Sequence, residues 1–417
     1  MYGTLALQPK AVDEYRTVAG DTAIDEVRRL AEPLRGLRVL HLSVTAFGTG
    51  VAELLNAAVP LLADVGLDCS WQVVRPVEES ASANKALYRA LAGFDDGWTP
   101  DMQDVWLRYS AMNAELLTEP FDVVVVHDPQ PAAIRSFVPE SSRAQTRWVL
   151  HSHLDLSSAS TVPWKMLRQH LDGYDAIVFD SDAFLHPSLR DQPVRVIRPA
   201  IDPLGPRNME LSGETIDTIL RRYGIDADRP LVSQLSPCDP ASDMLGAIDV
   251  HDGVRREVPG LQLVLIASSP PEDPDSIKYF DETVRKSMEY SDVHILRGVS
   301  EVGNVEVNAF QRASDVVIQK GLRKGFGLWI ADAQWKGRPV VTARTGGLGQ
   351  QVFDGETGFV ADTTDAFADR VSQLLRDPAL AARLGEAAHR HVSEHFLLTR
   401  FVADELRLLA GLTRTGV

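Results

Sequence analysis

Polar side chains follow two buried strands that the sequence predicts in the first half of the chain. The first strand spans residues 121–127 and the second spans residues 147–153, and both are mostly apolar, as the central strands of a parallel sheet are. The polar residues at or just beyond their ends are Asp128, Gln130, His151, His153 and Asp155. Because open α/β sheets bind ligands at the carboxyl ends of their strands, these residues predict a ligand site.

A glycine loop follows the first predicted strand, which spans residues 38–43. The loop contains Gly48, Thr49 and Gly50, and a helix begins directly after it. The spacing is not the GxGxxG pattern of dinucleotide sites. The loop is therefore either part of a ligand site or a plain connector between strand and helix.

A second glycine loop lies far along the chain. It contains Lys324, Gly325, Phe326 and Gly327, and a predicted helix begins at Leu328. Backbone N–H groups at the start of a helix are free to donate, and the positive end of the helix dipole favours an anion. This arrangement suits a phosphate, although many such loops only connect a strand to a helix.

Strands and helices alternate through both halves, which predicts an α/β fold of two doubly wound domains. We expect one domain over residues 1–205 and the other over residues 206–394. A C-terminal helix over about residues 395–417 is expected to pack back on the first domain. In this last part of the chain, continuous helices are predicted over residues 364–384 and 387–409.

Composition limits the class of protein. The 417 residues are enough for two domains with cores of their own. The formal charge of −16 disfavours nucleic acid and anionic membrane surfaces as partners. Cys69 and Cys238 form neither a disulfide framework nor a metal pattern. Without a leader segment or an apolar run near ~18 residues, we expect a reduced, cytoplasmic protein.

The order of motifs around the second glycine loop is more specific than the glycines. A GFG loop, an acid at Asp332 and the runs WKGRPVV, TGG and DGETGF follow one another between Gln319 and Phe359. This stretch resembles the nucleotide-sugar half of retaining glycosyltransferases of family 4. The resemblance implies the GT-B fold, in which two Rossmann-like domains face a cleft.

Stretches of the first half narrow the resemblance. They are SVTAFGTGVAE from Ser43, VHDPQP from Val126, HLDLS from His153 and RPAIDPLGPRN from Arg198. They look like trehalose glycosyltransferring synthase, and fungal-type trehalose phosphorylases share much of the pattern. The resemblance covers roughly residues 38–405. It implies that glucose is joined to glucose through an α,α-1,1 bond, with a nucleoside diphosphate glucose or glucose 1-phosphate as donor.

The resemblance implies roles for the residues at the strand ends. Asp128 and Gln130 would contact acceptor hydroxyls, His153 would face the transferred sugar, and Asp155 would hold hydroxyls or the histidine. Sugar hydroxyls both donate and accept hydrogen bonds, so carboxylates and amides suit them. The alternatives are an Asx turn at Asp128 and a buried structural histidine at His153. His151 is expected to be structural.

No metal site is expected, because His151 and His153 lack a third ligand in the sequence. The resemblance also implies that Gly48, Thr49 and Gly50 lie under the donor phosphates and the acceptor. In the second half, residues 324–328 and Asp332 would form the donor site.

The donor motif departs from the family pattern. The family holds the diphosphate with an Arg and a Lys after the first strand of the second domain, and this chain has Pro237 and Ser242 there. The family acid before GFG is Lys324, and the family Glu is Asp332, which is shorter by ~1.5 Å. Removing one preorganised donor to a developing charge typically costs ~10²–10³ in rate. A basic cluster could compensate, and it comprises Lys320, Arg323 and Lys324, with Arg344 nearby.

These observations predict a trehalose-synthase-like retaining hexosyltransferase with an altered donor or acceptor. The expected small molecule is a sugar or a cyclitol, with a nucleoside diphosphate sugar as substrate and with no cofactor. Two alternatives stay open, namely a non-catalytic sugar-binding or regulatory homologue and a trehalose phosphorylase. A homodimer is compatible with the sequence.

Overall fold

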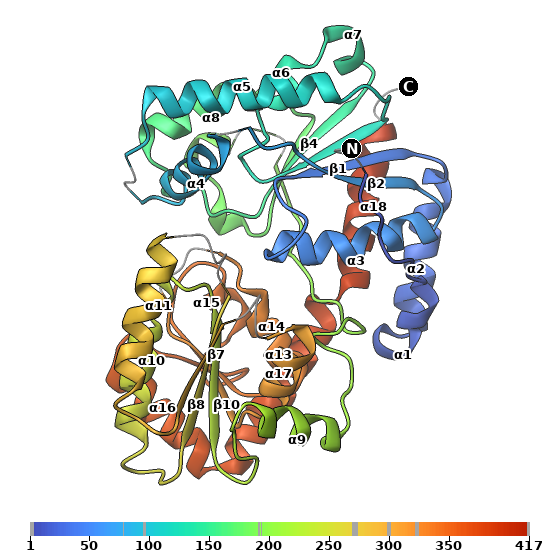
Figure 1. Cartoon of the computed structure of the whole chain (residues 1–417). Helices are drawn as coiled ribbons and strands as arrows, with labels where there is room; N and C mark the ends of the chain where they lie inside the picture. Colours follow the sequence, from blue (N-terminus) through green and yellow to red (C-terminus); the bar gives the residue numbers. More distant parts are fainter. Residues whose placement is uncertain are drawn as a thin grey trace. The chain divides into compact units, whose positions relative to one another are not determined.

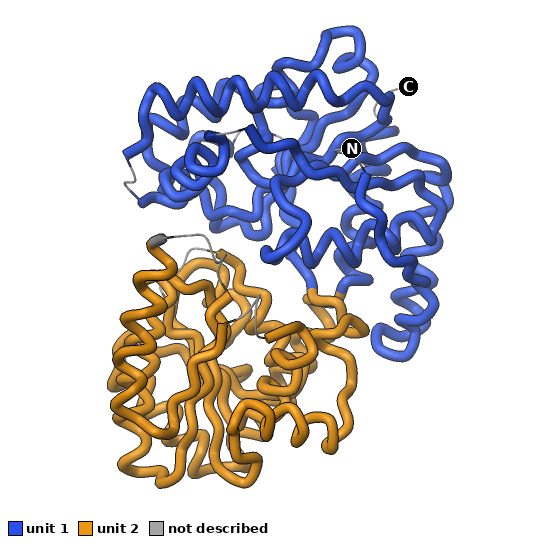
Figure 2. Tube along the Cα trace, in the orientation of Figure 1, with its two compact units in different colours: residues 1–200, 398–417 blue, residues 201–397 orange. Residues whose placement is uncertain are grey.

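The computed structural model describes residues 4–77, 79–94, 97–190, 192, 194–268, 274–297, 302–321 and 325–414. The chain forms two compact units (Figure 2). Unit 1 comprises residues 1–200 and 398–417, and unit 2 comprises residues 201–397. Each unit has its own parallel sheet covered by helices, as the sequence predicts for an α/β fold.

Unit 1 is built on a six-stranded sheet with the order β2-β1-β3-β4-β5-β6 (Figure 1). All neighbouring strands are parallel. The strands are β1 (Arg38–Ser43), β2 (Asp68–Val73), β3 (Val123–His127), β4 (Arg147–Ser152), β5 (Ala176–Phe179) and β6 (Val194–Val196). The central strands are buried on both faces, which explains their continuous apolar runs.

The two faces of this sheet carry different side chains, because successive residues of a strand point in opposite directions. One face carries Leu42, Val126 and Leu150, which pack into a large apolar cluster with Trp106 and Phe179. Helices on this side are α4 (Ser80–Leu91), α5 (Pro100–Leu116) and α8 (Thr161–Leu171). The opposite face carries His41, His127 and His151.

Three further helices of unit 1 pack against one another. They are α2 (Asp21–Ala31), α3 (Gly50–Asp64) and α18 (Leu398–Arg414). The ring of Phe401 in α18 stacks on His151 with centroids 6.1 Å apart, so α18 covers the histidine-bearing face of the sheet. The C-terminal helix therefore belongs to unit 1, although the whole of unit 2 separates it in sequence from the rest of that unit.

Unit 2 is built on a second six-stranded parallel sheet with the order β12-β11-β10-β7-β8-β9. The strands are β7 (Leu231–Ser236), β8 (Gln262–Ala267), β9 (Val293–Arg297), β10 (Val316–Gln319), β11 (Val340–Thr342) and β12 (Phe359–Val360). Apolar clusters lie on both faces of this sheet as well.

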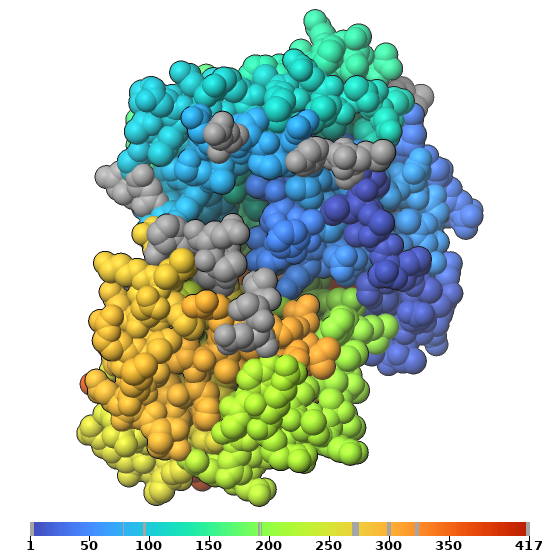
Figure 3. Space-filling view, in the orientation of Figure 1, coloured from blue at the N-terminus to red at the C-terminus, as the bar shows by residue number. Residues whose placement is uncertain are grey.

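Helices cover both faces of the second sheet. One side has α10 (Met244–Val254), α11 (Pro274–Ser287) and α16 (Thr364–Arg376). The other side has α9 (Gly213–Arg222), α13 (Asn304–Ala313), α14 (Leu328–Trp335) and α17 (Pro378–His395). In the space-filling view, α9 and α11 form part of the outer surface of this unit, and α5 forms part of that of unit 1 (Figure 3).

The predicted boundaries of the C-terminal helices were wrong. The first helix ends at Arg376, and α17 begins at Pro378 and runs to His395. Proline at the first helical position loses no intrahelical hydrogen bond there, whereas it would disrupt a helix interior. The Asp377 carboxylate accepts from the backbone N–H of Leu380 at 3.0 Å and caps the new helix.

Both cysteines are free. None of the helices in the described part of the chain has the length and apolarity that a membrane span needs.

Candidate active site

Each sheet has one point at which the strand order reverses. In unit 1 the chain runs from β1 to β2 and then returns to β3 on the other side of β1. In unit 2 it runs from β7 to β8 and β9, and then returns to β10 on the other side of β7. Ligands of open α/β sheets bind at the carboxyl ends of the strands at such switch points. The candidate site of each unit therefore lies in the loops that follow these strands.

The loop after β1 is exposed at the switch point of unit 1. Gly48 has φ of +77°, a left-handed conformation that glycine adopts without strain. The hydroxyl of Thr49 accepts from the N–H of Ala52 at 3.2 Å, and Gly50 is the first residue of α3. The ring of Phe47 at the tip of the loop is 78% exposed. This loop presents the start of a helix and an aromatic ring to solvent.

Asp128, directly after β3, has φ of +68°, which is costly for a residue other than glycine. Its carboxylate accepts from the backbone N–H of His153 at 2.9 Å, and its own N–H donates to the carbonyl of His151 at 2.9 Å. The expected alternative of a local Asx turn is replaced by a bond across to the next strand. Burial raises the pKa of Asp128. The strained residue thus joins the loops after β3 and β4.

Gln130 and Asp155 lie on the same two loops but differ in their partners. The buried Oε1 of Gln130 has no hydrogen-bond partner among the described residues, while its backbone carbonyl accepts from the indole N–H of Trp106 at 2.6 Å. The carboxylate of Asp155 accepts from the N–H and the hydroxyl of Ser157, at 2.9 and 2.5 Å. Gln130 therefore has a buried acceptor atom without a partner among the described residues, whereas Asp155 holds its own turn.

His153 is paired with Asp180, which follows β5. Its Nδ1 lies 2.9 Å from the Asp180 carboxylate, and its Nε2 lies 3.1 Å from Nδ1 of His127. Burial opposes the charged imidazole, but the Asp180 carboxylate raises the pKa of His153 to about 9. The imidazolium in turn holds the pKa of Asp180 below its usual value despite burial. Both ring nitrogens are engaged within the protein, so His153 contributes a largely covered positive charge and no free nitrogen.

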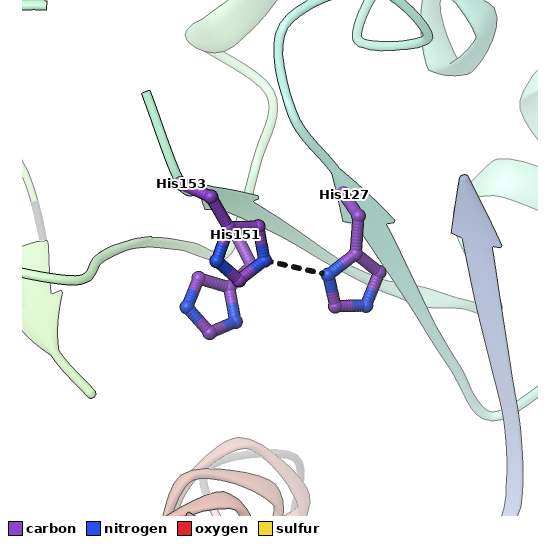
Figure 4. A group of neighbouring side chains, drawn as sticks. All are labelled: His127, His151 and His153. Carbon is purple, nitrogen blue, oxygen red and sulfur yellow. Dashed lines mark hydrogen bonds between the residues drawn. The ribbon is translucent and has the colours of Figure 1, made fainter. Parts of the chain in front are cut away.

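Three imidazoles cluster at this edge of the sheet (Figure 4). From the sequence, His151 and His153 were expected to lack a third candidate metal ligand. This expectation was wrong, because His127 lies beside them. The candidate ligand nitrogens all lie within 4.8 Å of one another, and tetrahedral zinc with Zn–N near 2.0–2.1 Å would hold them roughly 3.4 Å apart. The hydrogen bond between His127 and His153 joins two of them directly. The three rings therefore form a cluster in which two are joined by a hydrogen bond.

In unit 2, the loop after β7 holds both altered family positions. Pro237 follows the strand and has no N–H to donate. Ser242 is 1% exposed, and its hydroxyl donates to Asp239 at 3.0 Å. Gly321 packs directly on it, because an added Cβ on Gly321 would lie 2.9 Å from the Cα of Ser242. Neither position offers a cation.

A cation enters this loop from the neighbouring strand. Lys320 follows β10, and its backbone N–H donates to Gln234 of β7 at 3.2 Å. Its ammonium group pairs with the carboxylate of Asp243, which caps α10 by accepting from the N–H of Gly246 at 3.1 Å. An added Cβ on Gly246 would lie 2.5 Å from Nζ of Lys320. Lys320 therefore brings a positive charge to the start of α10 at the switch point.

The second glycine loop is tightly packed. The carbonyl of Gly325 accepts from the N–H of Gly347 at 3.0 Å, and Phe326 packs against Phe396 with ring centroids 5.6 Å apart. Gly327 has φ of +73° and directly precedes α14, whose first residue is Leu328. Lys324 and its neighbour Arg323 lie outside the described residues. The glycine loop and the helix start predicted from the sequence are present, and the phosphate site that they were predicted to form stays a prediction.

Asp332 is buried within α14 and belongs to a polar network. Its carboxylate accepts from the amide of Asn208 at 2.7 Å and lies 3.7 Å from the guanidinium of Arg207. One turn later, Lys336 donates to Asn208 at 2.7 Å and to Gln311 at 3.0 Å. Burial lowers the pKa of Lys336 to about 7. This network ties α14 to the segment that leads into unit 2.

A groove of about 1010 Å³ lies elsewhere in unit 2. Its lining includes Arg229, Asp315 and Arg338. These residues lie one or two positions before the starts of β7, β10 and β11, respectively. It is therefore at the amino ends of the strands, opposite the edge at which sheets of this kind bind ligands. Size alone does not make it the candidate site.

Comparison with known proteins agrees with this architecture. Residues 41–186 match the family model "Trehalose synthase, N-terminal domain", and residues 223–391 match "Glycosyl transferases group 1". The trehalose synthase of Rubrobacter xylanophilus is 38% identical over 97% of both chains. That of Thermococcus litoralis is 37% identical over 96% of this chain and 97% of the relative. A trehalose-phosphate synthase structure from Burkholderia xenovorans aligns with a TM-score of 0.71 at 13% identity, covering 89% of this chain and 99% of that one.

Two parallel sheets with this strand order define a GT-B glycosyltransferase, which confirms the predicted fold class. The family then follows from the matches to the two trehalose synthases, which are 37–38% identical over nearly the whole chain. The chain belongs to the trehalose synthase family, as the motifs predicted, and it is a trehalose-related glycosyltransferase.

Asp180, which pairs with His153, was not predicted from the sequence. It directly follows β5, so it follows the same rule as Asp128 and His153. The available signal was its position as a polar residue after a buried strand. What the sequence lacked was the pairing of β4 with β5, which brings the two strand ends together.

Proposed function

We propose that this protein is a retaining hexosyltransferase that forms a trehalose-like α,α-1,1 linkage and uses a donor or acceptor other than the usual one. The observation that carries the proposal is the position of Lys320 at the switch point of unit 2, beside the altered residue Ser242. The family supplies a cation from residue 242 itself, and here the cation comes from the next strand.

The donor diphosphate is assigned to the start of α10. The positive end of the helix dipole favours a phosphate, and the ammonium of Lys320 lies at the same place, where it pairs with the carboxylate of Asp243. In the transfer, the acceptor oxygen bonds to the anomeric carbon on the face from which the diphosphate leaves. The carbon–oxygen bond to phosphate breaks, and the acceptor proton passes to the departing phosphate oxygen. Lys320 stabilises the negative charge that develops on this group.

An altered donor follows from the residues that changed. Pro237 and Ser242 carry no charge, and the carboxylate of Asp332 already accepts from Asn208. Lys324 is a donor where the family has an acceptor. A sugar pocket that loses an acid and gains an amine binds the hydroxyls of glucose differently, so a different hexose or a cyclitol is the expected partner.

The acceptor is assigned to unit 1. The unpartnered Oε1 of Gln130 accepts from a hydroxyl, and the charged ring of His153 attracts hydroxyl lone pairs. Asp128 fixes the backbone between these residues. No metal is assigned to the reaction, since Lys320 and the start of α10 supply the positive charge.

A donor and acceptor panel tests the proposal. Release of nucleoside diphosphate would be measured with UDP-, ADP- and GDP-hexoses, each against glucose, other hexoses and cyclitols, with and without EDTA. We expect EDTA-insensitive turnover with at least one pair other than nucleoside diphosphate glucose and glucose, and a non-reducing product in which the transferred sugar is linked in the α configuration. Product with inverted configuration, or turnover only with phosphate and trehalose, would refute it.

The second candidate is a non-catalytic sugar-binding homologue. It is favoured by the occupied carboxylate of Asp332 and by the loss of both family cations from the loop after β7. Calorimetric binding of a sugar or cyclitol, with no diphosphate released by any donor of the panel, would establish this alternative in place of the transferase.

A further inference from the structure

Three imidazoles meet at the carboxyl ends of β3 and β4 (Figure 4). They belong to His127, His151 and His153, and one ring nitrogen of each lies within 4.8 Å of the other two. Two of these side chains are closer still, because Nδ1 of His127 lies 3.1 Å from Nε2 of His153. A tetrahedral metal ion with imidazole ligands holds their nitrogens roughly 3.4 Å apart. The three rings are therefore near the spacing that a metal ion requires.

The sheet itself brings the three rings together. His127 of β3 pairs directly with His151 of β4, and His153 stands two residues further on. Since alternate residues of a strand point to the same face, His151 and His153 lie on one side, with ring centroids 4.2 Å apart. The ring of His127 lies 5.5 and 5.4 Å from these two. The cluster is therefore built on strand ends, which hold ligands more precisely than long loops do.

Outer partners for the three imidazoles are also in place. Nδ1 of His153 lies 2.9 Å from the Asp180 carboxylate, and Nε2 of His127 lies 3.0 Å from Nδ1 of His41. Nε2 of His151 is buried without a hydrogen-bond partner among the described residues, and it lies 3.4 Å from the same Asp180 carboxylate. Metal-binding histidines usually turn their other ring nitrogen toward a carboxylate or another acceptor. Asp180 stands in this position toward two of the three rings.

Burial leaves two of the rings neutral. It holds the pKa of His127 well below its ordinary value and lowers that of His151 to about 4, so each ring keeps a lone pair for a metal ion. Helix α18 covers this face of the sheet, and its Glu405 carboxylate lies 3.4 Å from Nε2 of His41. The side chain of His153, at the edge, is 9% exposed. The cluster is thus covered by α18 and reaches the surface at His153.

We propose that His127, His151 and His153 form a binding site for one late divalent transition-metal ion, with Zn²⁺ as the expected one. Imidazole nitrogen suits zinc, nickel and copper, whereas Mg²⁺ and Ca²⁺ prefer oxygen ligands. On binding, the proton between Nδ1 of His127 and Nε2 of His153 is released to water, and both nitrogens bond to the ion through their lone pairs. Three protein ligands leave a fourth position for water. The ion joins the ends of β3 and β4, and the inference does not depend on the proposed function.

Metal titration of the EDTA-treated full-length protein tests the site without any assay of turnover. With Co²⁺ as the probe, visible absorption reports tetrahedral coordination, and we expect one ion per chain that Zn²⁺ displaces. Imidazole NMR should show shifts of the ring nitrogens of His127, His151 and His153 on addition of Zn²⁺, and Tm should rise with the Zn²⁺ concentration. His127→Gln removes a ligand and should abolish the Co²⁺ absorption. Asp180→Asn keeps the ligands and should weaken Zn²⁺ binding by about 10–100-fold, because an outer partner loses its charge.

His395→Gln is the matched control for binding elsewhere on the protein. His391 and His395 lie one turn apart in α17, with ring centroids 4.9 Å apart, but they belong to no three-ligand group among the described residues. This variant should keep one tightly bound ion per chain. Unaltered protein that retains no Zn²⁺ after dialysis, or folded His127→Gln that binds Zn²⁺ as tightly as the unaltered protein, would overturn the inference, and so would loss of the site in His395→Gln. If His127→Gln does not fold, the stoichiometry and the imidazole shifts of the unaltered protein still decide the question.

Discussion

Replacement of Lys320 by methionine separates a donor-site role from a structural one. The side chain is 12% exposed, and its ammonium pairs with Asp243, whose own side chain is 33% exposed. Methionine keeps the unbranched apolar stem and removes only the charge. Asp243 keeps its cap on the N–H of Gly246 at 3.1 Å, so α10 retains its start.

The two expected magnitudes differ enough to decide the question. Partly exposed ion pairs contribute about 0–1 kcal/mol, so the loss of stability should be about 1 kcal/mol at most. For a unit of this size, that corresponds to a fall in Tm of roughly 2–4 °C. Loss of one preorganised cation at a developing charge costs ~2.7–4 kcal/mol, or ~10²–10³ in rate. We therefore expect kcat/KM to fall at least about 100-fold with little change in Tm.

The assay is diphosphate release with the best donor of the panel, together with thermal unfolding of each variant. Lys286→Met is the matched control, because Lys286 also pairs with an aspartate of α10, Asp249, at 2.5 Å, and also has a mostly covered side chain. It should lose about as much stability and keep its kcat/KM. A folded Lys320→Met with kcat/KM within about threefold of the unaltered protein would refute the assignment of the donor diphosphate. So would an equal loss of activity in the control.

Three further predictions concern other parts of the two units. The unfolding free energy, measured by urea at several pH values, should peak near pH 6.5. Above it, the raised pKa values of His153 (about 9) and Glu405 (about 8) make the folded state lose stability as pH rises, by roughly 1.4 kcal/mol per pH unit for each proton released. Below it, the buried neutral His41 and His151, with pKa values of about 3 and 4, must take up protons on unfolding, so the unfolding free energy decreases as the pH decreases. A flat profile from pH 5 to 9 would contradict this. Phe47→Ala removes a ring that is 78% exposed, so it should leave Tm unchanged and raise the acceptor KM severalfold, and an unchanged KM would remove Phe47 from the site. Asp332→Asn should lower Tm, because it weakens a buried network, and should shift the titration of Lys336 further below about 7, which lysine-selective NMR would detect; an upward shift would show that the carboxylate does not stabilise the ammonium.

The sequence predicts the strands and their polar ends well, because both depend on local patterns. Apolar runs mark β3 and β4, and Asp128 and His153 stand where each run stops. The partners of these residues come from pairing, which local patterns do not contain. Asp180 meets His153 only because β5 lies beside β4, and Glu405 reaches His41 only because α18 returns to unit 1. The same reason explains why the sequence did not identify His127 as the third imidazole beside His151 and His153.

The altered donor motif shows that strand pairing can bring a charge to a place where the linear motif lacks one. Compared along the chain, Pro237 and Ser242 remove two charges, and Lys320 is one member of a basic run. In space, β10 is the neighbour of β7, so the residue after β10 reaches the loop after β7. Ser242 is 1% exposed, and the backbone of Gly321 packs directly on it. The pairing of β10 with β7 therefore carries Lys320 to the start of α10, beside the small residue at position 242.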